Sequence, residues 1–134
     1  MLDLRSSGIG DDGAKYLSEV LLCNNSLKIL NLGASSIGFD GLNCLTKSLS
    51  LSSTIKKIFL ENNLFVQVQD FKPFENVLLK NSSLIEINLK WMKLSKENGK
   101  HLVDCLQHNT TLTCIRLDLS IKFQRKVVSC IAKR

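Results

Sequence analysis

Apolar residues return along the chain with a period of 28 or 29 residues. A triplet of Leu or Ile, spaced three and then two residues apart, begins at positions 27, 55, 84 and 112. The second half of each triplet alternates apolar and polar residues, which is typical of a short strand with one buried face. Periods of this length mark proteins built from stacked repeats. The triplets are Leu27, Leu30 and Leu32; Ile55, Ile58 and Leu60; Leu84, Ile87 and Leu89; and Leu112, Ile115 and Leu117, with Leu2 and Leu4 ending an earlier copy.

Each strand is followed by a turn and a helical pattern. In the second copy, residues 33–38 form a glycine-bounded turn and Asp40 is placed to cap the helix that follows. Leu42, Leu45 and Leu49 then recur at helical spacing, so one helix face is apolar. The same pattern predicts helices near residues 11–23, 40–51, 70–80, 96–108 and 122–133. The residues expected to end the first four helices are Asn24, Ser52, Asn81 and Asn109.

One strand and one helix cannot bury both apolar faces alone, so the copies must stack with their strands in a parallel sheet. Parallel strands lie about 4.8 Å apart, whereas packed helices need roughly 8–10 Å between their axes. The stack must therefore bend towards its sheet. The predicted fold is an α/β leucine-rich-repeat horseshoe solenoid of about 4.5 repeats, with the sheet on the concave side and the helices on the convex side. Residues 1–134 form one domain.

Two stretches resemble the consensus of the ribonuclease-inhibitor-like leucine-rich-repeat family. The first has Leu2-Asp3-Leu4, then Ile9 to Ala14, Leu17, Val20-Leu21 and Asn24 to Leu27; the second runs from Leu89 to Leu112 with Gly99, Leu102, Leu106 and Asn109. The resemblance covers essentially the whole chain and implies 28–29-residue units with a full helix on the convex side. The family includes nuclease inhibitors, GTPase activators, actin-filament caps, immune receptors and ciliary or bacterial-effector proteins. The resemblance therefore implies a fold without naming a partner.

The chain departs from the family pattern at two places. The family favours Asn or Cys after the strand, where the side chain hydrogen-bonds neighbouring loops in a ladder. Met92 cannot donate such a bond, so we expect the ladder to break there. The third copy loses its glycines, and Phe65, Phe71 and Phe74 are predicted to fill the core that small residues fill elsewhere. The ladder positions are Ser7, Ser35, Asn63, Met92 and Ser120.

The net charge of +6 is a property of the C-terminal end. Residues 119–134 hold five of the 18 Lys and Arg residues and none of the 12 acidic ones, so the rest of the chain is nearly neutral. No basic stripe with interleaved aromatics predicts nucleic-acid binding. No secretory signal or membrane span is visible, so we expect a cytoplasmic protein without membrane contact. Residues 119–134 are predicted to hold a basic capping helix whose Phe123, Val127 and Ile131 cover the last core layer.

No constellation of residues predicts catalysis, a cofactor or a metal. His101 and His108 lie two helical turns apart with no third ligand. Asp11 and Asp12 favour a helix start rather than a catalytic pair. Gly8, Gly10 and Gly13 fit turn geometry better than a phosphate loop. Five cysteines are scattered without metal-ligand spacing, and they are expected to be free thiols; they are Cys23, Cys44, Cys105, Cys114 and Cys130.

The outward side of the strands is the predicted contact surface. Phe59 and Trp91 are large aromatics expected on this side, and aromatics are enriched at protein interfaces. An alternative places Trp91 under the following loop as a packing residue. A second alternative moves the contact to the basic C-terminal helix, around Arg125 and Lys126. The predicted partner-binding residues are Lys57, Phe59, Asn88, Lys90, Trp91 and Arg116.

The sheet surface alone is small for a stable interface. Five strands at ~4.8 Å spacing and roughly 17 Å length present on the order of 400 Å², whereas a standard interface takes about 800 Å² from each partner. Loops must therefore join the contact, or the chain is a segment of a longer array, as its start inside a strand indicates. We expect a non-enzymatic protein-binding module, a structural adaptor within a multi-subunit complex. The alternatives are a GTPase activator using Arg5, a nuclease inhibitor, or a host-directed effector.

Overall fold

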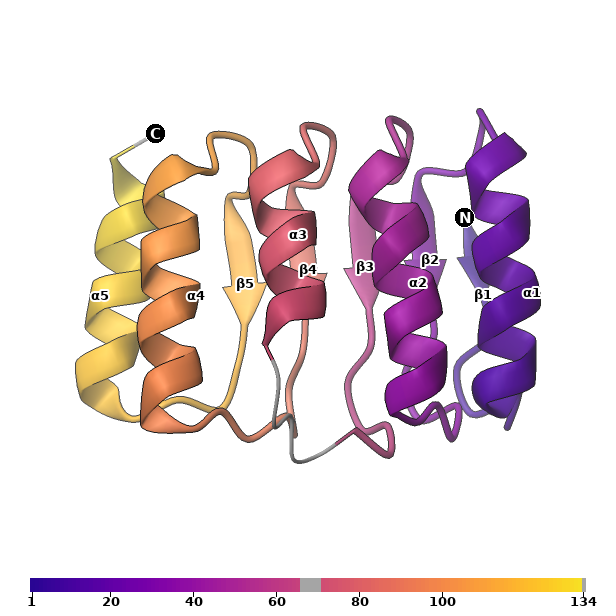
Figure 1. Ribbon diagram of the computed structural model, residues 1–134, viewed down its shortest axis with the longest axis horizontal. Coiled ribbons are helices and arrows are strands. Elements are labelled where there is room, and N and C mark those ends of the chain that lie inside the picture. The colour runs from indigo at the N-terminus through magenta and orange to yellow at the C-terminus, as the bar shows by residue number, and fades with distance from the viewer. Residues whose placement is uncertain (66–70, 134) are drawn as a thin grey trace.

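The computed structural model describes residues 1–65 and 71–133, except for the side chain of Ile121. In these residues, five short strands alternate with five helices (Figure 1). The strands are β1 (Leu2–Asp3), β2 (Ile29–Asn31), β3 (Lys57–Phe59), β4 (Glu86–Asn88) and β5 (Cys114–Arg116). The helices are α1 (Gly10–Cys23), α2 (Phe39–Leu51), α3 (Lys72–Lys80), α4 (Lys96–His108) and α5 (Ile121–Ala132).

The strands form one parallel sheet in chain order, from β1 to β5. Leu30 pairs with Ile58, Ile58 with Ile87, and Ile87 with Ile115. These are the central residues of the apolar triplets, so the sequence period and the sheet register coincide. The prediction of a parallel sheet is confirmed.

The core lies between the sheet and a layer of helices that covers one of its faces (Figure 1). The strand residues Leu30, Ile58 and Ile87 are almost completely buried, and they pack in the same cluster as helix residues such as Leu45 and Leu102. The third copy fills the same layer with phenylalanines, as predicted. Its three buried rings belong to Phe65, Phe71 and Phe74, and the last two are stacked with their centroids 5.8 Å apart.

The predicted helices differ from the observed ones by one residue or less at most ends. Helix α3 begins at Lys72, with Pro73 in its first turn, where proline is favoured. The predicted start at residue 70 lies outside the described residues. At nine residues, α3 is shorter than α2 and α4, which have 13 each.

The prediction that Asp40 caps α2 is wrong. The helix begins at Phe39 after Gly38, and no side chain of its own caps it. The carboxylate of Asp11, from the preceding repeat, accepts hydrogen bonds from the N–H groups of Gly38 (2.7 Å) and Gly41 (2.9 Å). A Cβ at Gly41 would lie 2.5 Å from that carboxylate oxygen, so the glycine makes room for the cap. The N–H groups at the start of α2, which have no partner within the helix, are thus capped by a side chain of the preceding repeat.

Buried asparagines tie successive repeats together. The Asn63 side chain accepts hydrogen bonds from the N–H groups of Ser35 and Ile37 and donates to the carbonyls of Leu32 and Leu60. Met92 occupies the equivalent place in the next repeat. It is buried and has no side-chain donor, so the amide contacts of Asn63 are not repeated there.

A second set of polar contacts follows the helices. At the end of α3, Asn81 donates to the carbonyls of Leu49 and Ser52 and accepts from the N–H groups of Ser83 and Leu84. The four predicted helix-ending residues are indeed the C-caps. All four have extended rather than left-handed backbones, and the backbone N–H of each donates to the carbonyl four residues before it in the helix.

Helix α5 covers the last layer of the core. Val127 is 5% exposed and the Phe123 ring packs over Gly99 of α4, where an added Cβ would lie 3.3 Å from it. Ile131 is half-buried against the same cluster. Among the described helices, none is long and apolar enough to cross a membrane.

Candidate functional site at the sheet face

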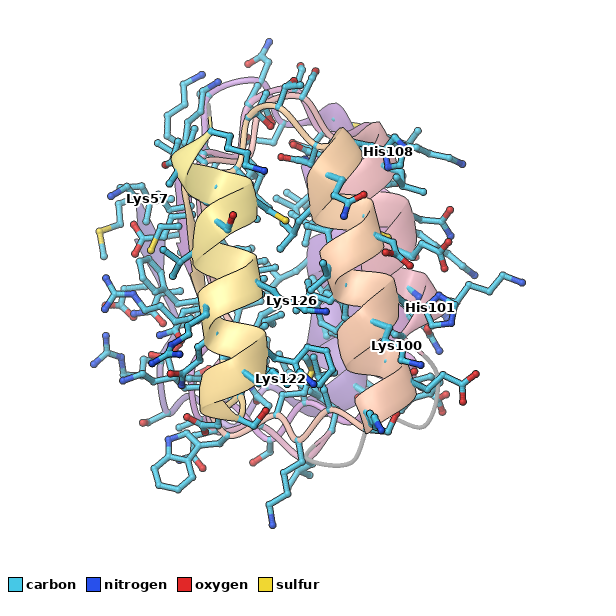
Figure 2. The ribbon with its side chains drawn as sticks, turned by 90° about the vertical axis from the view of Figure 1, so that its left-hand side faces the viewer. Lys57, Lys100, His101, His108, Lys122 and Lys126 are labelled. Carbon is cyan, nitrogen blue, oxygen red and sulfur yellow. The ribbon has the colours of Figure 1, made fainter. Side chains whose placement is uncertain are left out.

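The face of the sheet opposite the helices, called the sheet face below, carries an ion triad across three strands. Glu86 of β4 lies between Lys57 of β3, at 2.9 Å, and Arg116 of β5, at 3.1 Å. The Glu86 side chain is 11% exposed, whereas those of Lys57 and Arg116 are 39% and 52% exposed. Figure 2 shows Lys57 on the side of the molecule away from α4. The buried acid therefore positions two cations that partly face solvent.

The surroundings of Glu86 favour its charged form. The hydrogen bond from Lys57 lowers the pKa of Glu86, burial acts in the opposite direction, and the bond from Arg116 lowers the pKa further. The net effect is a pKa below the ordinary carboxyl value. Glu86 is therefore ionised at neutral pH, and it holds Lys57 and Arg116 in place on this part of the sheet face.

Phe59 and Asn88 are opposite each other on neighbouring strands, but they offer different amounts of surface. Phe59 is partly exposed, whereas Asn88 is only 8% exposed. The Asn88 carboxamide oxygen accepts a hydrogen bond from the N–H of Lys90, 3.2 Å away. This side-chain oxygen therefore already has a partner at the end of the same strand. Asn88 can therefore give a partner little contact area, and its part in the binding surface stays a prediction.

Trp91 occupies an unusual backbone position. It lies in the turn after β4 with a φ of +72°, and its side chain is 64% exposed. The equivalent residues after β1, β2 and β3 are Ser6, Ala34 and Asn62, also with positive φ. A bulky residue in the left-handed region is a true outlier, since its Cβ crowds the backbone. The alternative in which Trp91 is tucked under the following loop is wrong, because most of its side chain faces solvent.

The turn that carries Trp91 is also held differently from its neighbours. In the three earlier repeats, the N–H at this position donates to a backbone carbonyl of the next repeat; the acceptors are Gly33, Glu61 and Lys90. The N–H of Trp91 instead donates to the Asp118 carboxylate, 2.7 Å away. A charged acceptor makes a stronger hydrogen bond than a carbonyl. Asp118 thus fixes the backbone that presents the indole.

A buried carboxylate oxygen on the sheet face has no partner among the described residues. It is Oε2 of Glu61, while Oε1 of the same residue lies against Gly33. A buried polar atom without a partner costs free energy in the isolated protein. Because this oxygen is itself buried, it offers a bound molecule no accessible acceptor.

The structure brings the predicted residues to one side of the molecule, with Trp91 and Lys90 in the turn that extends the sheet face and Lys57, Phe59 and Arg116 on its strands. The sequence prediction did not single out Glu86, Asp118 and Glu61. Opposite charges at paired positions of neighbouring strands, such as Lys57 and Glu86, were the signal for the triad. Nothing in the local sequence indicates the side-chain acceptor at Asp118 or the unpaired oxygen of Glu61.

The other candidate chemistry groups stay apart. His101 and His108 lie on the side of α4 away from α5 (Figure 2). Within residues 1–65 and 71–133, no three His, Cys, Asp or Glu side chains gather closely enough to hold a metal ion. Each of the five cysteines is a free thiol. Burial raises the pKa of the Cys105 thiol to about 11. That thiol is therefore protonated and unreactive at neutral pH.

Comparison with other sequences gives two relatives. No protein-family model matches the chain. A mouse protein, NACHT, LRR and PYD domains-containing protein 9B, is 30% identical over 106 residues, which are 78% of this chain and 10% of that protein. Mouse NACHT, LRR and PYD domains-containing protein 4C is 28% identical over 93 residues, 69% of this chain and 10% of that protein. The chain thus spans about a tenth of the length of these relatives.

Comparison with solved structures gives close matches in shape. Leiomodin-1 actin-binding site 2 superposes with a TM-score of 0.85 at 17% identity, over 98% of this chain and 78% of that one. The tropomodulin C-terminal domain of Caenorhabditis elegans gives a TM-score of 0.78 at 14% identity, over 92% of this chain and 75% of that one. These likenesses, together with the repeat period and the sheet register, show a leucine-rich-repeat-like fold.

Proposed function

We propose that the chain is a non-enzymatic module that binds another protein through the sheet face and the turn at Trp91. It acts as a structural adaptor within a larger intracellular assembly, of a cytoskeletal, ciliary or signalling kind, in the cytoplasm. The observation that carries the proposal is Trp91, an exposed indole on a left-handed backbone where the three earlier repeats place Ser6, Ala34 and Asn62. Strained residues cluster at functional sites, and tryptophan is prominent among binding hot spots.

The proposed architecture is an arc of a horseshoe solenoid of the ribonuclease-inhibitor-like class, with about 4.5 repeats. The constant 28–29-residue step and the one-helix, one-strand unit support this class. The arc is short, so the strand-end turns add the area that the strands alone lack. Trp91 lies in such a turn, which is why the contact is centred at this edge rather than at the middle of the sheet.

Charges around this surface set the orientation of the partner. Lys57 and Arg116 are held by Glu86, and Lys90 is exposed beside Trp91. Cations at the edge of an interface mainly change the association rate and its salt dependence. The partner therefore places apolar side chains on Phe59 and Trp91 and acidic groups near these three cations.

The solved structures suggest a first partner to test. Leiomodin-1 actin-binding site 2 is an actin-binding segment by its name, and it has the same fold as this chain. Actin is therefore the first candidate to test as a partner of this chain. Affinity capture from the native cell, followed by mass spectrometry, widens the search to other proteins.

The test compares Trp91→Ala with Tyr16→Ala. Tyr16 is 68% exposed on α1, so its variant removes an equally accessible aromatic away from the sheet face. For a captured partner, measured by calorimetry, Trp91→Ala is expected to cost on the order of 2 kcal/mol in binding, while Tyr16→Ala leaves affinity unchanged. Equal affinities for the wild type and Trp91→Ala, with both folded, would reject the proposal. If Arg125→Glu with Lys126→Glu abolishes binding instead, the contact is on α5.

A further inference from the structure

A groove separates α4 from α5 at the C-terminal end of the stack. It encloses about 700 Å³, within the range of roughly 300–1,000 Å³ typical of ligand pockets. Val103 and Leu106 of α4 and Cys130 of α5 form its apolar part, and Lys126 and Lys133 project from the α5 side. Lys126 extends from α5 towards α4 (Figure 2).

We propose that this groove binds an acidic segment of a second protein, in which two carboxylates flank a pair of apolar residues. The carboxylates pair with Lys126 and Lys133, and an apolar side chain lies on the partly exposed Cys130 above the groove floor. The groove lies between helices on the far side of the core from the sheet face. This site is therefore additional to the proposed contact at Trp91.

Among the described residues, no carboxylate offsets the charge of the groove. Its described lining side chains include two lysines and no carboxylate. The carboxylates of α4, Glu97 and Asp104, belong to a different depression together with Lys96, Lys100 and His101. The two ion pairs in the described part of the chain both involve Glu86, on the sheet face. Unpaired cations beside a partly apolar cavity attract carboxylates and raise the association rate of an acidic partner.

The floor of the groove is apolar but offers little surface, since Val103 is 8% and Leu106 1% exposed, and only Cys130 is partly exposed. Near the start of α5, Phe123 fills the space over Gly99. Towards the other end, the Cys130 sulfur lies 4.0 Å from the Val103 carbonyl, and both residues also line the groove.

The spacing of the lysines defines the ligand further. Lys126 and Lys133 are seven residues apart along α5 and its C-cap, which corresponds to ~10.5 Å at 1.5 Å per residue. A peptide in the polyproline II conformation advances about 3.1 Å per residue and completes one turn in three residues. Two acidic residues three positions apart therefore lie on the same side of the peptide, roughly 9 Å apart along its axis. The segment that fits has the form acidic–apolar–apolar–acidic.

The probe for this proposal is a fluorescein-labelled synthetic peptide with a glutamate–leucine–leucine–glutamate core between glycine–serine flanks. Fluorescence anisotropy is expected to show saturable binding to the wild-type chain. The double variant Lys126→Glu, Lys133→Glu is expected to weaken binding at least tenfold. The matched control, Lys96→Glu with Lys100→Glu, makes the same charge change on the opposite side of α4 and should leave affinity unchanged. Equal losses in both variants would overturn the proposal.

Cysteine protection gives an independent readout on the wild-type protein. Saturating peptide is expected to slow the alkylation of Cys130 in the groove, but not that of Cys23, which is exposed on α1. Unchanged alkylation of Cys130 would overturn the proposal, as would equal binding of a peptide with lysines in place of the glutamates. Trp91→Ala should bind the peptide as the wild type does. Failure of the Trp91 proposal would therefore leave this result intact, and the reverse also holds.

Discussion

At the scale of single residues, Trp91 combines two unfavourable properties in the isolated chain. Its backbone is left-handed and its indole is mostly in solvent. A left-handed backbone costs a residue with a Cβ roughly 1–2 kcal/mol. Asparagine tolerates this conformation better, and Asn62 shows that the same turn accepts it one repeat earlier.

We therefore predict that Trp91→Asn raises the free energy of unfolding by about 1 kcal/mol while weakening partner binding, because it relieves the backbone and removes the indole. Urea denaturation followed by circular dichroism measures the first effect. Asn62→Trp is the matched control, since it places the indole on the neighbouring turn and should destabilise the protein. A lower unfolding free energy for Trp91→Asn would mean that the indole has a packing role.

At the scale of elements, the ion triad joins three strands through one buried acid. Because the pKa of Glu86 is lowered on folding, its contribution is fully present above the ordinary carboxyl value of 4.5 and is lost as the pH falls through the lowered value. Glu86→Gln is expected to cost on the order of 1 kcal/mol at neutral pH. Chemical denaturation should show the difference from the wild type shrinking below pH 4.5. A difference independent of pH would contradict a role for the charge.

Helix α5 is predicted to keep the end of the core covered. Removing every residue after Leu119 should expose Val103 and Leu106 of α4, which the whole chain buries almost fully. Exposed apolar surface of this kind promotes association. Light scattering and a thermal melt are expected to show aggregation and a lower midpoint. Unchanged solubility and an unchanged thermal midpoint would show that the core does not need α5 to cover its end.

Most helix and strand boundaries could be predicted from the sequence. The repeating apolar positions determine both how the strands pair and which face of each helix is buried. The cap of α2 could not be predicted in this way, since the actual acceptor is Asp11, 27 and 30 residues before the glycines that it caps. The low exposure of Asn88 also escaped prediction, because it depends on the neighbouring strands, which place Phe59 and Arg116 on either side of it. Contacts between repeats are therefore the part of the structure that a local pattern does not contain.

At the scale of the whole molecule, the cysteines report on folding at several separated places. Alkylation of the unfolded protein without reductant should modify five thiols. In the folded protein, exposed Cys23 is expected to react first and Cys105 last, because burial raises the pKa of Cys105 to about 11 and keeps it protonated. Mass spectrometry over time measures both results. A bridged peptide, or fast modification of Cys105, would contradict the expected thiol state.

The candidate site was partly predictable at this scale. Outward strand positions follow from the two-residue alternation, which placed Lys57, Phe59 and Arg116 on the sheet face. The backbone of Trp91 and the acceptor at Asp118 could not be predicted, because they depend on how two successive turns meet. The residues that face outward from the sheet therefore follow from the sequence repeat. The backbone strain at Trp91 depends instead on contacts between successive repeats.

The hydrogen bonds that Asn63 accepts from the previous repeat affect the order in which the chain folds during synthesis. Its carboxamide serves the N–H groups of Ser35 and Ile37, which belong to the previous repeat. On a ribosome, those groups emerge well before Asn63 does, so the second repeat cannot complete its hydrogen bonds until the third has followed it. We expect folding to trail synthesis by about one repeat, which is the interval in which a chaperone would find the nascent chain.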